Sequence, residues 1–181
     1  ALQTLAFKLL CCDEQMNVTA EIRLRMIESL ALASGSRGMA GGQAIDLAAV
    51  GQVLDLAQLE NMHIHKTGAL IRASVRMATM AAKDADPKIV KGMDHYAKCI
   101  GLAFQVRDDI LDVEGNTETL GKTQGSDQAR EKPTYPALLG LQEARAMATE
   151  LCQEASASLD GLDNKADPLR WLAEYIVSRP H

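Results

Sequence analysis

The stretch GLAFQVRDDILD, residues 101–112, is the most informative segment of this 181-residue chain. At about 100° per residue, Gln105, Asp108 and Asp112 fall within about 60° of one another around a helix. Asp109 lies at the edge of this polar stripe, and apolar residues cover most of the remaining circumference. A helix that is apolar on most sides is buried, so we expect the stripe to line an interior cavity.

The three aspartates repel one another unless a cation lies between them. At about 4 Å, each like-charge contact costs roughly 1 kcal/mol in water and about 4 kcal/mol at an effective dielectric of 20. No Lys or Arg lies three or four residues away on the same face, since Arg107 points elsewhere. A divalent cation would compensate, and oxygen donors with open positions suit Mg²⁺, with Mn²⁺ as a substitute. Taken alone, the D-D-x-x-D pattern fits a solvated acidic helix end equally well.

Two other metal-site patterns are not met. An EF-hand loop counted from Asp112 would have Thr117 where Gly is needed and Thr123 where Glu is needed. The cysteines form no C-x-x-C pair and no regular spacing, so they suggest neither a zinc site nor a disulfide framework. His63 and His65 are two residues apart and point to nearly opposite sides of a helix, which makes them surface or packing residues.

The composition favours helices throughout. Hydrophobic residues make up 47% of the chain but aromatic residues only 3%, and the apolar residues are mainly Ala, Leu, Ile and Met. These lose little entropy in a helix, whereas strands draw on β-branched and aromatic residues. We therefore predict a single all-α domain over residues 1–181, a helical bundle without strands. The expected helices cover residues 1–10, 19–34, 43–50, 54–83, 87–113, 137–159 and 168–177.

The charge and the hydropathy pattern exclude several partners. The net charge of −5 argues against a nucleic-acid surface, although metal ions can still bridge an acidic protein to a polyanion. No apolar run is long enough to span a bilayer, and the cysteine usage is typical of a reducing cytoplasm. Residues 1–10 read as helix with no capping residue before them, so we expect the sequence to start partway into a larger protein.

Several polar residues outside the aspartate stripe are candidate binding residues. Lys66 lies in the long pattern of residues 54–83, where a lysine either meets an anion or extends outward to solvent. Lys122 and Lys132 lie in the polar segment 114–136, which is consistent with a mobile flap over a phosphate and equally with a solvated loop. Gln43 and Asp46 are three residues apart on one helix face. They form either a pair that binds substrate or a structural contact between helices.

The order and spacing of these motifs resemble the trans-isoprenyl diphosphate synthase family over nearly the whole chain. The motifs that carry the resemblance are Gly42-Gln43-x-x-Asp46, Lys66-Thr67-Gly68, Phe104-Gln105-x-x-Asp108-Asp109-x-x-Asp112, Gly121-Lys122 and Lys132. The residues around them, 65–71 and 134–140, look most like the bacterial farnesyl diphosphate synthases. The resemblance implies the isoprenoid synthase type of bundle, here lacking its N-terminal helices, and a homodimer.

The resemblance also implies a role for each matching residue. Asp108 would ligate Mg²⁺ directly, and Asp109 and Asp112 would complete the site through metal-bound water. The allylic diphosphate would contact Lys66 and Lys122, with Lys132 closing over it. Independently of the resemblance, the polar and non-periodic segment 115–136 is expected to become ordered when Mg²⁺ and a diphosphate bind, because contacts to its lysines offset the entropy of fixing it. The hydroxyl group of Thr67 and the amide oxygen of Gln105 would face the allylic carbon and stabilise its cation.

The implied reaction is prenyl transfer. An allylic diphosphate would condense with isopentenyl diphosphate, release pyrophosphate and give farnesyl diphosphate. The family's first aspartate-rich motif would lie upstream of Ala1, so residues 1–181 alone are expected to be inactive. Alternatives are a synthase of geranylgeranyl or longer diphosphates and a non-catalytic subunit of a heterodimer. A helical Mg²⁺ pyrophosphohydrolase is disfavoured, because such enzymes typically pair E-x-x-E motifs and this sequence has none.

Overall fold

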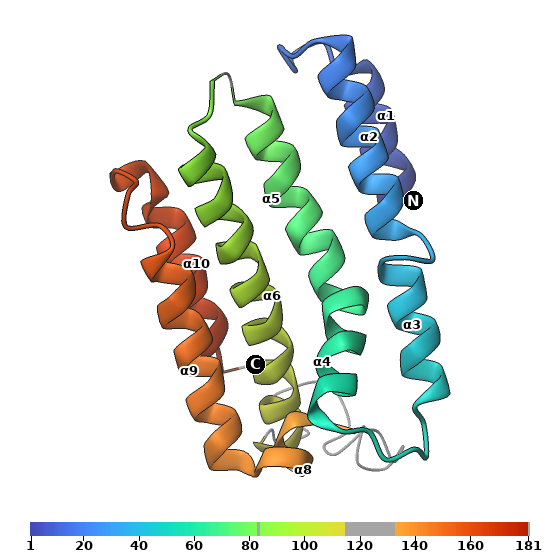
Figure 1. The fold of residues 1–181 in the computed structure, drawn as a ribbon, viewed down its shortest axis with the longest axis vertical. Coiled ribbons are helices and arrows are strands. Elements are labelled where there is room, and N and C mark those ends of the chain that lie inside the picture. The colour runs from blue at the N-terminus through green and yellow to red at the C-terminus, as the bar shows by residue number, and fades with distance from the viewer. Residues whose placement is uncertain (83, 115–132, 181) are drawn as a thin grey trace.

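A computed structural model describes residues 1–82, 84–114 and 133–180, and within these ranges every regular element is a helix (Figure 1). The predicted all-α fold is confirmed for this part of the chain. None of its helices is both long and apolar enough to cross a membrane. The elements are α1 (Leu2–Cys12), α2 (Ala20–Ser34), α3 (Met39–Ala48), α4 (Leu56–His63), η1 (Ile64–Gly68), α5 (Ala69–Ala81), α6 (Pro87–Glu114), α8 (Tyr135–Leu139), α9 (Leu141–Ala157), η2 (Asn164–Ala166) and α10 (Asp167–Ser178).

Helix α6 carries the aspartate stripe and lies between α5 and α9 (Figure 1). It begins where the sequence predicts, because the Asp86 carboxylate accepts a hydrogen bond of 2.8 Å from the Lys88 amide and Pro87 fits the first turn. Val106 and Ile110 of α6 are fully buried in a core formed with α4, α8 and α9. The hydroxyl group of Tyr96, also in α6, donates to the Leu169 carbonyl at 2.8 Å and ties α10 to the same helix. The site helix is therefore fixed from several sides.

The predicted helix over residues 54–83 is in fact three elements. Helix α4 ends at His63, η1 is a π-helical segment over Ile64–Gly68, and α5 continues from Ala69. A π-helical turn inserts an extra residue into the helical repeat, and the apolar periodicity on either side hides it. The segment thus looks like one helix in sequence although its hydrogen-bonding pattern changes in the middle.

Two other predicted boundaries were wrong for reasons that involve glycine. The expected helix over residues 137–159 is divided at Gly140, whose φ of 87° ends α8 and starts α9. The expected helix over residues 43–50 begins earlier, at Met39, so that Gly42 lies inside α3. A Cβ atom at Gly42 would lie 2.1 Å from the Lys66 amide nitrogen, so this glycine serves close packing and does not mark a helix end.

Candidate functional site

The π-helical segment η1 places two candidate residues, Lys66 and Thr67, against neighbouring helices. Gly42 of α3 allows the backbone of η1 to approach closely at Lys66. On the other side, a Cβ atom at Gly101 of α6 would lie 3.3 Å from the Cα atom of Gly68. Single π-helical turns are rare, and they are frequent at functional sites. Small residues on both neighbours thus let η1 fit between α3 and α6.

Lys66 is held by a buried carboxylate from α3. Its Nζ atom donates to Asp46 Oδ2 at 2.9 Å, and the Asp46 side chain is 5% exposed whereas that of Lys66 is 29% exposed. The buried aspartate offsets the cost of bringing the ammonium group partly out of water. The structure therefore pairs Asp46 with Lys66, and it leaves Gln43, the other member of the candidate pair, exposed on α3.

A chain of hydrogen bonds runs from Thr67 to the start of α8. The Thr67 hydroxyl donates to Gln105 Oε1 at 3.1 Å, and Gln105 Nε2 donates to Asp109 Oδ1 at 3.0 Å. The second carboxylate oxygen of Asp109 accepts from the Tyr135 amide, also at 3.0 Å. Because an ionised carboxylate only accepts, the amide group of Gln105 has to face Asp109 and its oxygen has to face Thr67. Asp109 thereby sets the orientation of Gln105.

The two adjacent aspartates have different surroundings. Asp109 is 3% exposed and accepts the two hydrogen bonds described above, so its carboxylate forms part of the packing between α6 and α8. The Asp108 side chain is 41% exposed and forms an ion pair with Arg179, which follows α10. Asp112, one turn beyond Asp108 on α6, is half-buried. Asp108 and Asp112 are thus the more accessible carboxylates of the stripe.

Arg179 supplies the compensating cation that sequence reasoning did not find near Asp108. Its guanidinium group lies 4.3 Å from the centroid of the Phe104 ring, a distance that suits a cation–π contact. Arg107 Nη2 donates to the Arg179 carbonyl at 2.8 Å and so fixes the end of α10. Arg179 lies far from Asp108 in sequence, so the spacing of residues along α6 could not reveal this pair.

A buried aromatic pair packs beside the Asp109 network. The rings of His63 and Tyr135 stack with centroids 5.6 Å apart, and both side chains are buried. Burial raises the pKa of the Tyr135 hydroxyl group well above its usual range, with smaller contributions from the carboxylates of Glu60 and Asp109. Tyr135 is therefore neutral at physiological pH and acts in packing. His65 lies apart from this pair, with Nδ1 2.7 Å from the Asn61 carbonyl oxygen.

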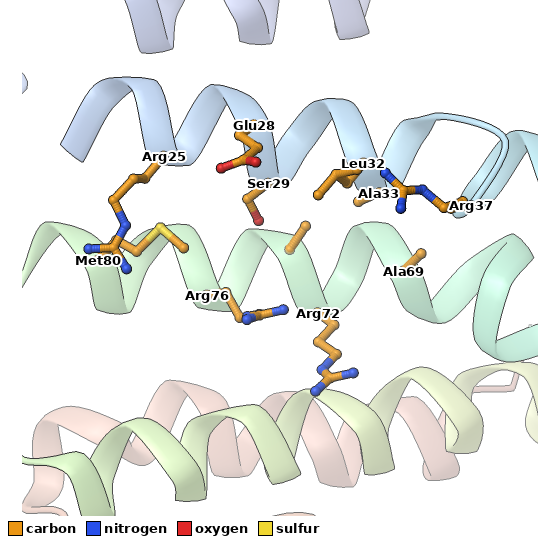
Figure 2. Close-up of a pocket in the computed structure, with 11 residues that line it drawn as sticks. Arg25, Glu28, Ser29, Leu32, Ala33, Arg37, Ala69, Arg72, Arg76 and Met80 are labelled. Atoms are coloured by element: carbon orange, nitrogen blue, oxygen red, sulfur yellow. The ribbon is translucent and has the colours of Figure 1, made fainter. Parts of the chain in front are cut away.

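The two larger cavities in the described part of the bundle lie away from the aspartate stripe. One, of about 520 Å³, lies between α2 and α5 and is lined by four arginines, among them Arg25 and Arg72 (Figure 2). The Arg72 guanidinium extends toward α6, where it forms two hydrogen bonds to Asp94 of 2.6 and 2.8 Å. The other cavity, of about 540 Å³, lies between the α4–α5 segment and α6. Neither cavity is lined by Gln105 or by the three aspartates of the stripe.

Two further candidate residues, Lys122 and Lys132, lie in the segment 115–132, outside the described residues. Among the described candidates, the structure joins Asp46 to Lys66 and Thr67 to Gln105 and Asp109. Sequence reasoning missed Arg179 and the π-helical turn, since both depend on contacts between distant segments.

Comparison with known proteins gives a consistent picture. The sequence model of the polyprenyl synthetase family matches residues 2–166. The farnesyl diphosphate synthase of Escherichia coli is 51% identical over 182 aligned residues, which cover 99% of this chain and 61% of the relative. The farnesyl diphosphate synthase of Geobacillus stearothermophilus is 40% identical, with 99% of this chain and 60% of that protein covered. The chain thus spans about three fifths of the length of these curated relatives.

Solved structures show the same arrangement of helices. The FPP/GFPP synthase of Zymomonas mobilis superimposes with a TM-score of 0.82 at 38% identity, covering 97% of this chain and 57% of the other. The geranyltransferase of Helicobacter pylori, solved with magnesium and isoprenyl diphosphate, gives a TM-score of 0.76 at 34% identity, with coverages of 96% and 55%. The fold and the sequence therefore point to the same family.

Proposed function

The chain belongs to the polyprenyl synthetase family, and we propose on this basis that the whole protein is a prenyltransferase. It would condense an allylic diphosphate, dimethylallyl or geranyl diphosphate, with isopentenyl diphosphate. The products would be pyrophosphate and farnesyl diphosphate, as the names of the most similar curated relatives suggest. The observation that carries the proposal is the Thr67–Gln105–Asp109 chain of hydrogen bonds next to Lys66. Lys66 supplies a cation that can bind a diphosphate, and Thr67 and Gln105 supply oxygens that can stabilise a carbocation.

The accessible carboxylates fit a hard divalent cation. Asp108 and Asp112 offer oxygen donors one turn apart on α6, and neither side chain is buried. Asp108 already attracts a cation in this structure, the guanidinium group of Arg179. We propose that these two residues hold Mg²⁺, or Mn²⁺ in its place, and that Asp109 contributes chiefly by positioning its neighbours. A bound ion of this kind would stabilise the negative charge that develops on the leaving diphosphate.

In the proposed reaction, the allylic carbon–oxygen bond breaks and its electron pair leaves with pyrophosphate. The Lys66 ammonium group, held by Asp46, would bind a diphosphate oxygen and stabilise the charge there. The Thr67 and Gln105 oxygens would stabilise the allylic cation. The double bond of isopentenyl diphosphate then supplies the electrons for the new carbon–carbon bond. Loss of a proton to pyrophosphate restores the alkene, so no residue of the chain has to act as the base.

Lys122 and Lys132 complete the proposed diphosphate site. The family resemblance assigns both to the allylic diphosphate, and a lysine binds a phosphate as a mobile point charge. Since the segment 115–132 lies outside the described residues, the proposal for these two lysines rests on the sequence motifs alone. Gln43 stays a proposed substrate contact on the same basis.

A product assay on the intact protein tests the proposal. Radiolabelled isopentenyl diphosphate, dimethylallyl diphosphate and Mg²⁺ should give farnesyl diphosphate, identified by chromatography. Asp108→Asn should lower kcat much more than it raises KM for isopentenyl diphosphate, because the proposed ion acts on charge that develops in the transition state. Lys66→Gln should lower kcat/KM for the allylic substrate. Lys91→Gln, a change of an exposed lysine on the same helix as Asp108, is the matched control.

Each other outcome of this assay has a defined meaning. Geranylgeranyl or longer products would support the alternative synthase and overturn the farnesyl assignment. No product from a folded intact protein would overturn the enzymatic proposal and favour a non-catalytic subunit. Equal losses in the Asp108→Asn and Lys91→Gln variants would show that the aspartate has no specific role.

We further propose that the protein acts as a homodimer. Large apolar side chains of α1 and α2 are exposed, namely Leu2, Leu5, Leu9 and Leu24. Clustered exposed apolar side chains favour contact with another protein surface. Light scattering of the intact protein at micromolar concentration should give the mass of two chains. A monomer mass would show instead that this surface is covered within one polypeptide.

A further inference from the structure

Three residues that the proposed reaction does not use come together where α6 packs against α9. His95 and Cys99 are one turn apart on α6, and Glu154 reaches them from α9. Cys99 Sγ lies 3.6 Å from His95 Nε2 and 3.7 Å from Glu154 Oε2. His95 Nε2 and Glu154 Oε2 are also 3.7 Å apart. The three donor atoms thus form a nearly equilateral triangle.

This triangle has the size of one face of a tetrahedral metal site. Zinc bonds of about 2.3 Å to sulfur and about 2.0–2.2 Å to nitrogen and oxygen, at the tetrahedral angle, separate the donors by about 3.4–3.6 Å. The observed separations of 3.6, 3.7 and 3.7 Å exceed these values only slightly. We propose that His95, Cys99 and Glu154 bind a borderline divalent cation of the Zn²⁺ class and thereby link α6 to α9.

The surroundings allow an ion to enter. The side chains of His95 and Glu154 are 52% and 60% exposed, whereas Cys99 is buried beneath them. His95 and Cys99 also line the cavity of about 540 Å³, which leaves room for water at the fourth coordination position. Lys98 lines the same cavity, but its ammonium group lies 3.5 Å from the Asp94 carboxylate, which offsets its charge. The ion can therefore approach from solvent and find the thiol at the base of the site.

The ligand atoms of this site differ in chemical type from those of the aspartate stripe on α6. Thiolate and imidazole select zinc-class ions, whereas an all-carboxylate site suits Mg²⁺. The two sites are also apart, since Cys99 and Asp108 are separated by about 13 Å along α6. Without a metal, burial and, secondarily, the Glu154 carboxylate raise the pKa of Cys99 to about 11, so the thiol is protonated at neutral pH. Binding therefore has to release one proton from Cys99 to solvent as the sulfur–metal bond forms.

Cobalt(II) is a suitable probe, because a thiolate–cobalt bond gives a charge-transfer absorption that Mg²⁺ cannot give. The intact protein, with the exposed Cys11 and Cys12 replaced by serine and with excess Mg²⁺ present, should bind a single Co²⁺ with this absorption. Zn²⁺ should displace the cobalt and raise the melting temperature. Cys99→Ala should abolish the absorption. Glu154→Gln should weaken Co²⁺ binding by about tenfold or more, since even the loss of a residue that only supports a ligand costs about that much.

The matched controls are Cys152→Ala and Glu150→Gln. Cys152 is a second partly buried thiol, and Glu150 is an exposed carboxylate one turn before Glu154 on α9. Both variants should bind Co²⁺ as the parent does. Absence of the absorption in the parent, or its persistence in Cys99→Ala, would overturn the site. If Cys99→Ala fails to fold, the exposed Glu154 still decides the matter, because unchanged binding in Glu154→Gln would also overturn it.

Discussion

Replacement of Asp109 by asparagine tests whether the orientation of the Gln105 amide matters for the proposed chemistry. The two side chains have nearly the same shape, but asparagine carries an NH₂ group where aspartate has an acceptor oxygen. If the new side chain keeps accepting from the Tyr135 amide, its NH₂ group faces Gln105. Gln105 then has to flip, and its own NH₂ group replaces the oxygen that now accepts from Thr67. The substitution thus reverses the two hydrogen bonds that link residue 109 to Gln105 and Gln105 to Thr67, while the bond from the Tyr135 amide is unchanged.

The expected magnitudes separate folding from catalysis. After the flip the NH₂ groups of both amides have acceptors, but the half-buried Thr67 hydroxyl gives up its acceptor, the Gln105 oxygen. The cost is that of one hydrogen bond, about 1 kcal/mol of the free energy of unfolding. The proposed chemistry loses an oriented oxygen near the allylic cation, and loss of one preorganised group of this kind lowers kcat by about a hundredfold. Asp109→Ala differs, because the half-buried Gln105 Nε2 and the buried Tyr135 amide both lose their acceptor. At roughly 1–3 kcal/mol for each donor, about 4 kcal/mol in total, the melting temperature should fall by about 8–16 °C.

Thermal melting and steady-state kinetics of the intact protein at saturating Mg²⁺ provide the assay. Asp109→Asn should melt within a few degrees of the parent, about 2–4 °C, but should have a much lower kcat. Asp160→Asn, a change of an exposed aspartate after α9, is the control and should alter neither quantity. A parent-like kcat in Asp109→Asn would refute the argument from amide orientation. A loss of stability equal to that of Asp109→Ala would refute the flip itself.

Further predictions concern close packing, the ion pair at the stripe and pH. Gly42→Ala should lower the free energy of unfolding by about 1–3 kcal/mol in chemical denaturation and reduce kcat/KM, because the new Cβ atom would lie 2.1 Å from backbone of η1. Arg179→Gln should tighten Mn²⁺ binding about fivefold by calorimetry, since the guanidinium group no longer competes for Asp108 and such a pair is worth about 1 kcal/mol. Hydrogen bonding to Arg72 lowers the pKa of Asp94 in the folded protein. The pair therefore stabilises the fold at pH values above the unfolded pKa of about 3.9, and this stability is lost as the pH falls through the lower pKa of the folded state. Melting curves of Asp94→Asn and the parent should therefore differ at neutral pH and converge as the pH falls below about 4.

The amino-acid sequence determined the fold class and the position of the main candidate residues along the helices. Ala, Leu and Met dominate the apolar residues, and helix formation by such residues depends on neighbours within a few positions. For the same reason the start of α6 at Pro87 agrees with the expected helix over residues 87–113, since the capping residue Asp86 directly precedes it in sequence. The order of the motifs was sufficient to suggest the family, because Lys66-Thr67 and Gln105 are recognisable in sequence without their contacts.

Only the tertiary structure decided which of these residues meet. The repeat along α6 put Asp108 on the polar stripe and Asp109 at its edge, but it identified no partner for either. In the structure Asp108 faces Arg179, and Asp109 is buried against the start of α8. Both partners come from segments that are distant in sequence, and the spacing along one helix carries no information about them. The same holds for the proposed zinc-class site. No metal-binding motif is visible in sequence around Cys99. The third ligand, Glu154, comes from another helix and joins the cluster only when α6 packs against α9.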